Sequence, residues 1–383
     1  MGLRCAIVPP TPVPYREPLF RALNERPELD IRVIYQSAGQ SSWDVSADWF
    51  PTRHPYPGVN LRSWQRGRPG RTPVVLPRGL ERALRRADPD CVVVWEYGAA
   101  SLRALSWCRR HRRAYVIFTE CTPAIDSMLP RWQLALHRRL ARRADGIIAA
   151  SSAARERLLS FGVPGDRITV ALQAADVERF RAAAAKPRDQ GFKIISVGRL
   201  VPDKNFGTLI RATPADAELE IVGTGFLEDE LKQLAGGQAA RVSFRGHVAP
   251  DELPGLYAAA DAYALVSTYE PFGVAVREAA AAGLPIVCSR AAGAAGDVAI
   301  EGRNALLVDP HNVDEVSVAL ARLAADPGLR ERMGAESRAI DRETDGVEVD
   351  AFVEAVTAAA RRYSPSSAGS TSAAIRVTDA SGR

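Results

Sequence analysis

Two carboxylates flank a glycine at the start of a predicted helix, and this arrangement can hold a phosphate between two hydroxyl-bearing groups. A β-like run at residues 262–266 leads to Glu270, and a helix that begins at about Gly273 carries Glu278. The first turn of a helix offers unpaired N–H groups and a partial positive charge, which suit a phosphate. The carboxylates would lie at most about 12 Å apart, on a rise of roughly 1.5 Å per residue. Hydroxyls on both sides of a phosphate describe a nucleotide sugar.

Two cations follow an earlier β-like run. Arg199 and Lys204 flank a turn between a strand that ends at Gly198 and the next predicted helix. Arginine offers a planar fork and lysine a mobile point charge, and together they suit a diphosphate. Two solvated surface cations are the common alternative. Their position after a parallel strand, where open α/β sheets bind ligands, favours the ligand-binding interpretation.

Two further strand ends would face the same ligand. Gly223 and Gly225 match half of a dinucleotide fingerprint, but Glu228 stands where the third glycine would be. We therefore interpret this segment as a tight strand-to-helix turn near the ligand and not as a nicotinamide site. Residues 245–248 end another strand, where His247 is expected to pack or hydrogen bond at the edge of the site and not to act as a base.

An alternative interpretation exists for the carboxylate pair as well. A helix-start acid and an ordinary surface glutamate would give the same pattern, because acids are favoured in first turns. Glu278, however, lies within the apolar helix predicted at 274–282, where an unpaired carboxylate would be costly, so we expect it to have a partner. The acids and the cations occur together in one half of the chain, and this combination indicates a ligand site more specifically than either feature alone.

The elements that must position these residues alternate between strands and helices, which is typical of parallel α/β layers. Residues 36–73 show no clear periodicity, and charged turns are predicted before residue 347. Strands are predicted near 4–8, 31–35, 91–95, 115–118, 146–150, 168–171, 194–197, 219–222, 242–244, 262–266, 286–289 and 305–308. Helices are predicted near 18–25, 78–86, 100–110, 132–143, 313–325 and 347–362.

This pattern predicts an α/β fold of two Rossmann-like domains that face a central cleft. The first domain would comprise residues 1–183 and the second residues 192–345, with a polar linker at 184–191. A helix at 346–363 would follow. Residues 364–383 are rich in small polar residues and are predicted to be disordered.

Composition excludes several classes of protein. No run approaches the roughly 18 apolar residues of a membrane span, and the start of the chain does not resemble a signal peptide, so we expect a cytoplasmic protein. The net charge of +5 over 383 residues is too mild to indicate nucleic acid. The cysteines and histidines show no zinc-like spacing, so no metal site is expected. The basic helix at 131–143 could make weak peripheral contact with an anionic membrane, with a plain solvated face as the alternative.

The second half of the chain, from about 194 to 325, is similar to the retaining glycosyltransferases of family 4 (group 1), which have the GT-B fold. The first half resembles the family more weakly, at 144–152 and 176–180. The motifs that carry the resemblance are Gly198-Arg199, Lys204-Asn205, Gly223-Thr224-Gly225, Arg245-Gly246, residues 257–261, residues 270–273, Glu278, residues 283–285 and residues 302–308.

By this resemblance, the catalytic residues would be Arg199, Lys204 and Glu270. The two cations would hold and stabilise the departing diphosphate, while Glu270 would bind sugar hydroxyls near the reacting carbon. Glu278 would bind the nucleotide ribose, and no metal or further cofactor would be required. The other donor-binding residues would be Gly198, Gly223, Gly225, His247, Val248, Phe272, Gly273 and Val274.

The resemblance also implies that the N-terminal domain binds the acceptor and that the helix at 346–363 returns to that domain. The chain departs from the family here. The usual glycine-rich first loop is replaced by the Pro-rich residues 9–16, and Glu120 follows a strand after which the family commonly has a histidine. Tyr15, Glu96 and Glu120 are therefore the acceptor candidates.

Together these features predict a retaining transferase that moves a hexose-type sugar from a nucleotide-diphosphate sugar to an acceptor hydroxyl. UDP, GDP and ADP donors remain open, as do lipid, polysaccharide and small-metabolite acceptors. A nucleotide-sugar epimerase or hydrolase would consume the donor without an acceptor. A non-catalytic nucleotide-sugar-binding protein is disfavoured by the intact charged residues, and a Rossmann oxidoreductase by the missing third glycine.

Overall fold

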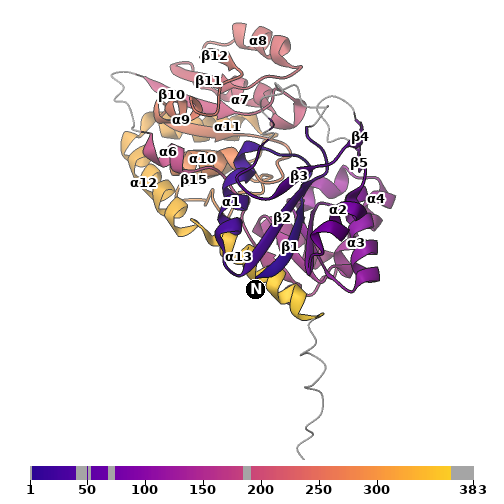
Figure 1. The fold of residues 1–383 in the computed structure, drawn as a ribbon. Coiled ribbons are helices and arrows are strands. Elements are labelled where there is room, and N and C mark those ends of the chain that lie inside the picture. The colour runs from indigo at the N-terminus through magenta and orange to yellow at the C-terminus, as the bar shows by residue number, and fades with distance from the viewer. Residues whose placement is uncertain (1, 40–49, 51–52, 68–73, 184–190, 364–383) are drawn as a thin grey trace, which may run out of the picture.

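The computed structural model describes residues 2–39, 50, 53–67, 74–183 and 191–363. Figure 1 shows two α/β units, each built on its own parallel sheet. Most of the predicted linker, residues 184–190, and the predicted disordered tail, residues 364–383, lie outside the described residues.

The first sheet has seven strands in the order β3-β2-β1-β6-β7-β8-β9, and every neighbouring pair is parallel. Its central strands are continuous apolar runs because helices cover both of its faces. The strands are β1 (Leu3–Val8), β2 (Leu29–Tyr35), β3 (Gly58–Asn60), β6 (Cys91–Trp95), β7 (Ala114–Thr119), β8 (Gly146–Ala149) and β9 (Ile168–Val170). The helices of this unit include α1 (Glu17–Glu25), α2 (Leu80–Ala87), α3 (Ala99–His111), α4 (Arg131–Arg143) and α5 (Ser152–Ser160).

The second sheet has six parallel strands in the order β12-β11-β10-β13-β14-β15. The strands are β10 (Phe192–Val197), β11 (Ala217–Val222), β12 (Arg241–Gly246), β13 (Ala262–Leu265), β14 (Ile286–Ser289) and β15 (Ala305–Val308). The helices of this unit include α6 (Glu178–Ala182), α7 (Phe206–Ala212), α8 (Glu228–Gly236), α9 (Leu253–Ala258), α10 (Val274–Ala281), α11 (Val313–Ala325) and α12 (Pro327–Glu343). The order reverses between β10 and β13, which places the carboxyl ends of these two strands at a switch point where such sheets bind ligands.

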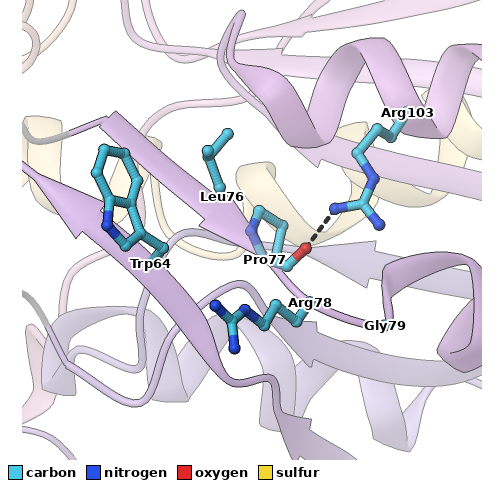
Figure 2. A pocket seen from close by; sticks show the side chains of 6 residues that line it. All are labelled: Trp64, Leu76, Pro77, Arg78, Gly79 and Arg103. Carbon is cyan, nitrogen blue, oxygen red and sulfur yellow. Dashed lines mark hydrogen bonds between the residues drawn. The ribbon is translucent and has the colours of Figure 1, made fainter.

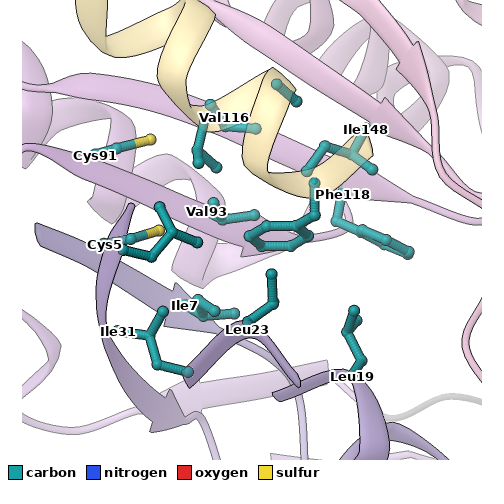
Figure 3. Close-up of a cluster of buried hydrophobic side chains, with 14 of the residues drawn as sticks. Cys5, Ile7, Leu19, Leu23, Ile31, Cys91, Val93, Val116, Phe118 and Ile148 are labelled. Atoms are coloured by element: carbon teal, nitrogen blue, oxygen red, sulfur yellow. The ribbon is translucent and has the colours of Figure 1, made fainter. Parts of the chain in front are cut away.

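The last helix, α13 (Val347–Arg361), leaves the second unit and packs on β7, β8 and β9 of the first. Phe352 and Val356 belong to the same buried cluster as Val93 and Val116 of the first sheet. Figure 3 shows this cluster, with Val116 and Ile148 beside the yellow C-terminal helix. The chain thus passes between the two units twice, once before α6 and once before α13.

Both passages meet at one buried arginine of α10. Arg277 is only 2% exposed. It donates hydrogen bonds to the carbonyl of Gln173 (2.9 Å) on the first passage and to that of Thr344 (3.5 Å) on the second. It also forms an ion pair with Glu348 of α13 at 3.0 Å. A buried guanidinium must be paired in this way because an unpaired charge would be costly.

Every strand predicted from the sequence is present, with shifts of a few residues at the ends. Two predictions were wrong. Residues 36–73, expected to lack clear periodicity, contain β3 and β4 (Ser63–Arg66), and β4 forms a short antiparallel hairpin with the following strand β5 (Val74–Pro77). The charged turns expected before residue 347 are the 17-residue helix α12. Asp326 caps this helix by accepting from the Leu329 N–H at 2.8 Å, and Pro327 fits its first position.

Among the described residues, no helix has both the length and the apolar character that a bilayer crossing requires.

Candidate active site

The carboxyl ends of β10 and β13 bring together the lysine and the first glutamate of the two predicted motifs. The Lys204 ammonium forms an ion pair with the Glu270 carboxylate, and both side chains are largely buried. The Ser267 hydroxyl lies 3.4 Å from the same carboxylate oxygen. The loop after β13 is fastened to the turn after β10, because the Thr268 N–H donates to the Asp203 carbonyl at 2.9 Å. The predicted meeting of cation and carboxylate at one sheet edge is therefore present in the fold.

The loop that carries Glu270 leads directly into α10. Gly273 caps this helix with a left-handed backbone, φ 97°, and no side chain caps its first turn. A side chain at Gly273 would also stand 3.2 Å from the Glu270 side chain. Phe272 of this loop is buried in the core of the second unit and so anchors the loop there. The helix N-terminus and the carboxylate are thus held side by side, as the sequence predicted.

The two glycines of the partial dinucleotide motif let the loops after β10 and β11 touch. A Cβ on Gly223, whose φ is 135°, would stand 2.0 Å from the Gly198 carbonyl oxygen. A Cβ on Gly225 would stand 2.4 Å from the Leu200 carbonyl oxygen. The Leu200 N–H donates to the Thr224 carbonyl at 2.8 Å, which completes this contact. The segment that bears Arg199 is therefore packed against a neighbouring turn, in agreement with the tight turn predicted there.

Glu278 has a partner, as expected from its apolar helix, but the partner is a hydroxyl and not a cation. Tyr257 of α9 donates to the Glu278 carboxylate at 2.9 Å. Burial raises the pKa of Glu278 to about 7, while the Tyr257 hydrogen bond and the charge of Arg179 act in the opposite direction. Arg179 is itself paired with Asp176 at 2.9 Å. Glu278, the fifth residue of α10, therefore lies in a polar group about one turn into the helix that begins beside Glu270.

Replacing Glu278 by glutamine should stabilise the protein most at alkaline pH. The native pKa of about 7 exceeds the ordinary value of 4.5, so the ionised carboxylate destabilises the native state as pH rises through 7. We expect the free energy of unfolding of Glu278→Gln to rise by about 1–3 kcal/mol at pH 8 and by less than about 1 kcal/mol at pH 5. Urea denaturation at both pH values checks this, with Glu354→Gln on the exposed face of α13 as the control. An equal gain at both pH values would contradict it.

The acceptor candidates of the first unit also cluster. Glu96 follows β6 with a left-handed backbone, φ 58°. Its carboxylate accepts from the Glu120 N–H (2.6 Å) and from the Thr119 hydroxyl (2.9 Å). Burial and the charge of Glu120 raise the pKa of Glu96. Glu120 in turn forms a 3.0 Å ion pair with Arg16, a buried arginine that the sequence reasoning did not select.

Electrostatic contacts connect this cluster to the second unit. Burial raises the pKa of Tyr15, and the charges of Glu120 from its own unit and Glu270 from the other raise it further. Burial likewise raises the pKa of Tyr269, next to Glu270 in the sequence, with added contributions from Glu96 and Glu120. The structure thus brings the acceptor candidates toward Glu270. Tyr269 is a further residue that the sequence reasoning missed.

The remaining predicted residues lie at the end of β12. His247 is exposed there, beyond Gly246, whose carbonyl accepts from the Gly223 N–H at 2.9 Å. Val248 packs against the core cluster that contains Phe272. Across the described ranges, no group of His, Cys, Asp and Glu side chains is arranged to ligate a metal ion.

The paired parallel sheets, with charged residues at their carboxyl ends, define a two-domain α/β enzyme class of the GT-B type. Two family models match the chain and together span both units. The model described as Glycosyl transferases group 1 matches residues 177–340, and the one described as Glycosyltransferase Family 4 matches residues 21–179. The chain belongs to the group 1 glycosyltransferases of family 4. The predicted family, fold class and enzyme class are thereby confirmed.

Known proteins agree with this assignment. The chain is 33% identical over 278 residues to the GDP-mannose-dependent alpha-(1-6)-phosphatidylinositol monomannoside mannosyltransferase of Mycobacterium tuberculosis, covering 66% of this chain and 71% of that one. Its fold is similar to Anabaena HepE, solved in complex with UDP, with a TM-score of 0.73, 20% identity and coverage of 93% and 100%. It is also similar to the lipopolysaccharide outer core galactosyltransferase WaaB, with a TM-score of 0.69, 16% identity and coverage of 92% and 99%.

Proposed function

We propose that this chain is a retaining glycosyltransferase that moves a hexose-type sugar from a nucleotide-diphosphate sugar to an acceptor hydroxyl. The observation that carries the proposal is the Lys204–Glu270 pair at the switch point of the second sheet, beside the uncapped start of α10. A nucleotide-sugar donor is further supported by the GDP-mannose and UDP named for similar proteins.

The charges suit a departing diphosphate. As the sugar–phosphate bond breaks, negative charge grows on the diphosphate, so preplaced donors stabilise the transition state more than the ground state. The Lys204 ammonium has three N–H donors, and it can bind a phosphate oxygen while it still holds Glu270. Arg199 and the first N–H groups of α10 would supply further donors. In this proposal these groups take the place of a metal ion.

The two glutamates would bind opposite ends of the donor. Glu270, fixed by Lys204 and Ser267, would accept hydrogen bonds from sugar hydroxyls near the reacting carbon. Glu278, held by Tyr257, would accept from the ribose hydroxyls. The acceptor would enter from the first unit, where the charges of both Glu120 and Glu270 act on Tyr15.

A thermal-shift screen across UDP, GDP and ADP sugars tests the proposal. A donor at about 100 times its Kd stabilises the native state by about 2.7 kcal/mol, which raises the melting temperature measurably. We expect one nucleotide class to give this shift and Lys204→Ala to abolish most of it. The absence of a shift with every nucleotide sugar would contradict the proposal. Donor turnover at the full rate without any acceptor would favour an epimerase or hydrolase instead.

A further inference from the structure

The hairpin of β4 and β5 presents an apolar face to solvent. Trp64 and Leu76 are directly opposite each other in the hairpin, and they are 45% and 42% exposed. Val74, on the same face, is 60% exposed. Figure 2 shows Trp64, Leu76 and Pro77 along a surface depression that also includes Arg78 and Arg103. An aromatic and two aliphatic side chains grouped in this way indicate an interaction surface.

A strongly basic hollow adjoins this face. Five arginines line the hollow together with Ile34, Val59 and Leu61, and no acidic residue lines it. Where the structure describes the chain, no ion pair joins these arginines to an acid. Arg78 and Gly79 line both the hollow and the depression of the apolar face, so the two surfaces are continuous. The five residues are Arg32, Arg62, Arg78, Arg82 and Arg86.

We propose that the β4–β5 hairpin and this arginine hollow dock the enzyme on an anionic lipid bilayer. Anionic headgroups attract arginines near the surface. Tryptophan favours the level of the headgroups, and exposed Val and Leu side chains gain by entering the acyl boundary. A purely anionic polymer would satisfy the arginines but would leave the apolar face in water. The combination of charge and apolar surface therefore selects a bilayer.

The hairpin part of the docking surface lies near the sheet edge that carries the acceptor candidates, and the arginine hollow extends from it along β2, β3 and α2. The Gln65 side chain of β4 donates to the Gly39 carbonyl at 2.8 Å, which fastens the hairpin to the segment after β2. Tyr15 follows β1, Glu96 follows β6 and Glu120 follows β7. The carboxyl ends of parallel strands share one edge, so a bilayer held by the hairpin would border the acceptor side. In this respect the inference rests on the proposed function, and it implies an acceptor presented at a membrane surface.

The basic helix singled out from the sequence is a weaker candidate. Trp132 of α4 is 69% exposed, but the surrounding basic side chains are partly engaged within the protein. Arg138 stacks on the Phe161 ring, and the Arg142 side chain donates to the Phe161 carbonyl at 2.6 Å. Helix α4 therefore serves as the matched comparison surface.

Co-sedimentation of the full chain with vesicles tests the proposal, with phosphatidylcholine alone or mixed with phosphatidylglycerol. We expect binding to the anionic vesicles only. Each lost arginine should weaken binding roughly fivefold, so we expect about 100-fold weaker binding by the triple variant Arg62→Gln/Arg78→Gln/Arg82→Gln. Trp64→Ser/Leu76→Ser should bind about tenfold more weakly or worse. The matched α4 variants, Arg131→Gln/Arg139→Gln/Arg143→Gln and Trp132→Ser, should bind like the wild type.

Three outcomes would overturn the proposal. They are a wild type that ignores anionic vesicles, loss of binding in the α4 variants with retention in the hairpin variants, and arginine-dependent binding that Trp64→Ser/Leu76→Ser leaves unchanged. The last result would indicate a soluble polyanion as the partner. The nucleotide-sugar thermal shift is measured on every variant and should stay at the wild-type value. Because that shift requires no membrane, failure of the donor assignment and failure of the docking surface can be told apart.

Discussion

Glu270→Ala should lower the rate of nucleoside-diphosphate release from the donor by about 100- to 1,000-fold, the range seen when one electrostatic contact to a transition state is lost. The substitution removes the carboxylate proposed to accept hydrogen bonds from sugar hydroxyls, and it leaves the Lys204 ammonium without its carboxylate partner. It also empties the space beside Gly273, where the Glu270 side chain packs at the start of α10. Release is measured with the donor that the thermal-shift screen selects, with and without acceptor.

The second unit contains a matched control for this experiment. Glu228 and Lys232 of α8 form an exposed ion pair at 2.7 Å. Exposed pairs of this kind contribute about 0–1 kcal/mol to stability. Glu228→Ala should therefore retain nearly full turnover and a nearly unchanged melting temperature. Turnover of Glu270→Ala within a few-fold of the wild type would refute the role given to this carboxylate.

Lys204→Ala should lower kcat at least about 100-fold, because the ammonium that would hold the diphosphate of the bound donor would also stabilise the charge that grows on this diphosphate as it leaves. Lys232→Ala is the corresponding control, with the same change in net charge. The double variant Lys204→Ala/Glu270→Ala should be less impaired than the product of the single effects, since paired residues are not additive. Full additivity would show that the two side chains act independently, and near-normal transfer by Lys204→Ala would refute its assignment.

The fold could be predicted largely from local patterns. Strands β6, β14 and β15 are short apolar runs bounded by turn residues, and the structure has them where the sequence placed them. Helix α12 was missed because charged residues dominate it, although Met333 and Ile340 are buried. Its cap, Asp326, with the following proline was the available signal.

The site was predictable where its residues lie in short motifs at strand ends. Lys204 and Glu270 belong to such motifs, and a parallel sheet brings motifs of this kind to one edge. Tyr257, the partner of Glu278, and Arg16, the partner of Glu120, could not be assigned in the same way. Each is distant in the sequence from the acid it contacts, so its role arises only from tertiary packing. The exposed hairpin could not be predicted for a different reason: its two strands are too short to show a strand periodicity in the sequence.

Arg277 precedes Glu278 in the sequence, and its side chain forms hydrogen bonds with both segments that connect the two halves. Any rotation of the two halves relative to each other must therefore pivot at this guanidinium or break its hydrogen bonds. Arg277 and Glu278, the acid proposed to bind the ribose, share one turn of α10, so we expect nucleotide binding and any rotation of the two halves to be coupled through this turn.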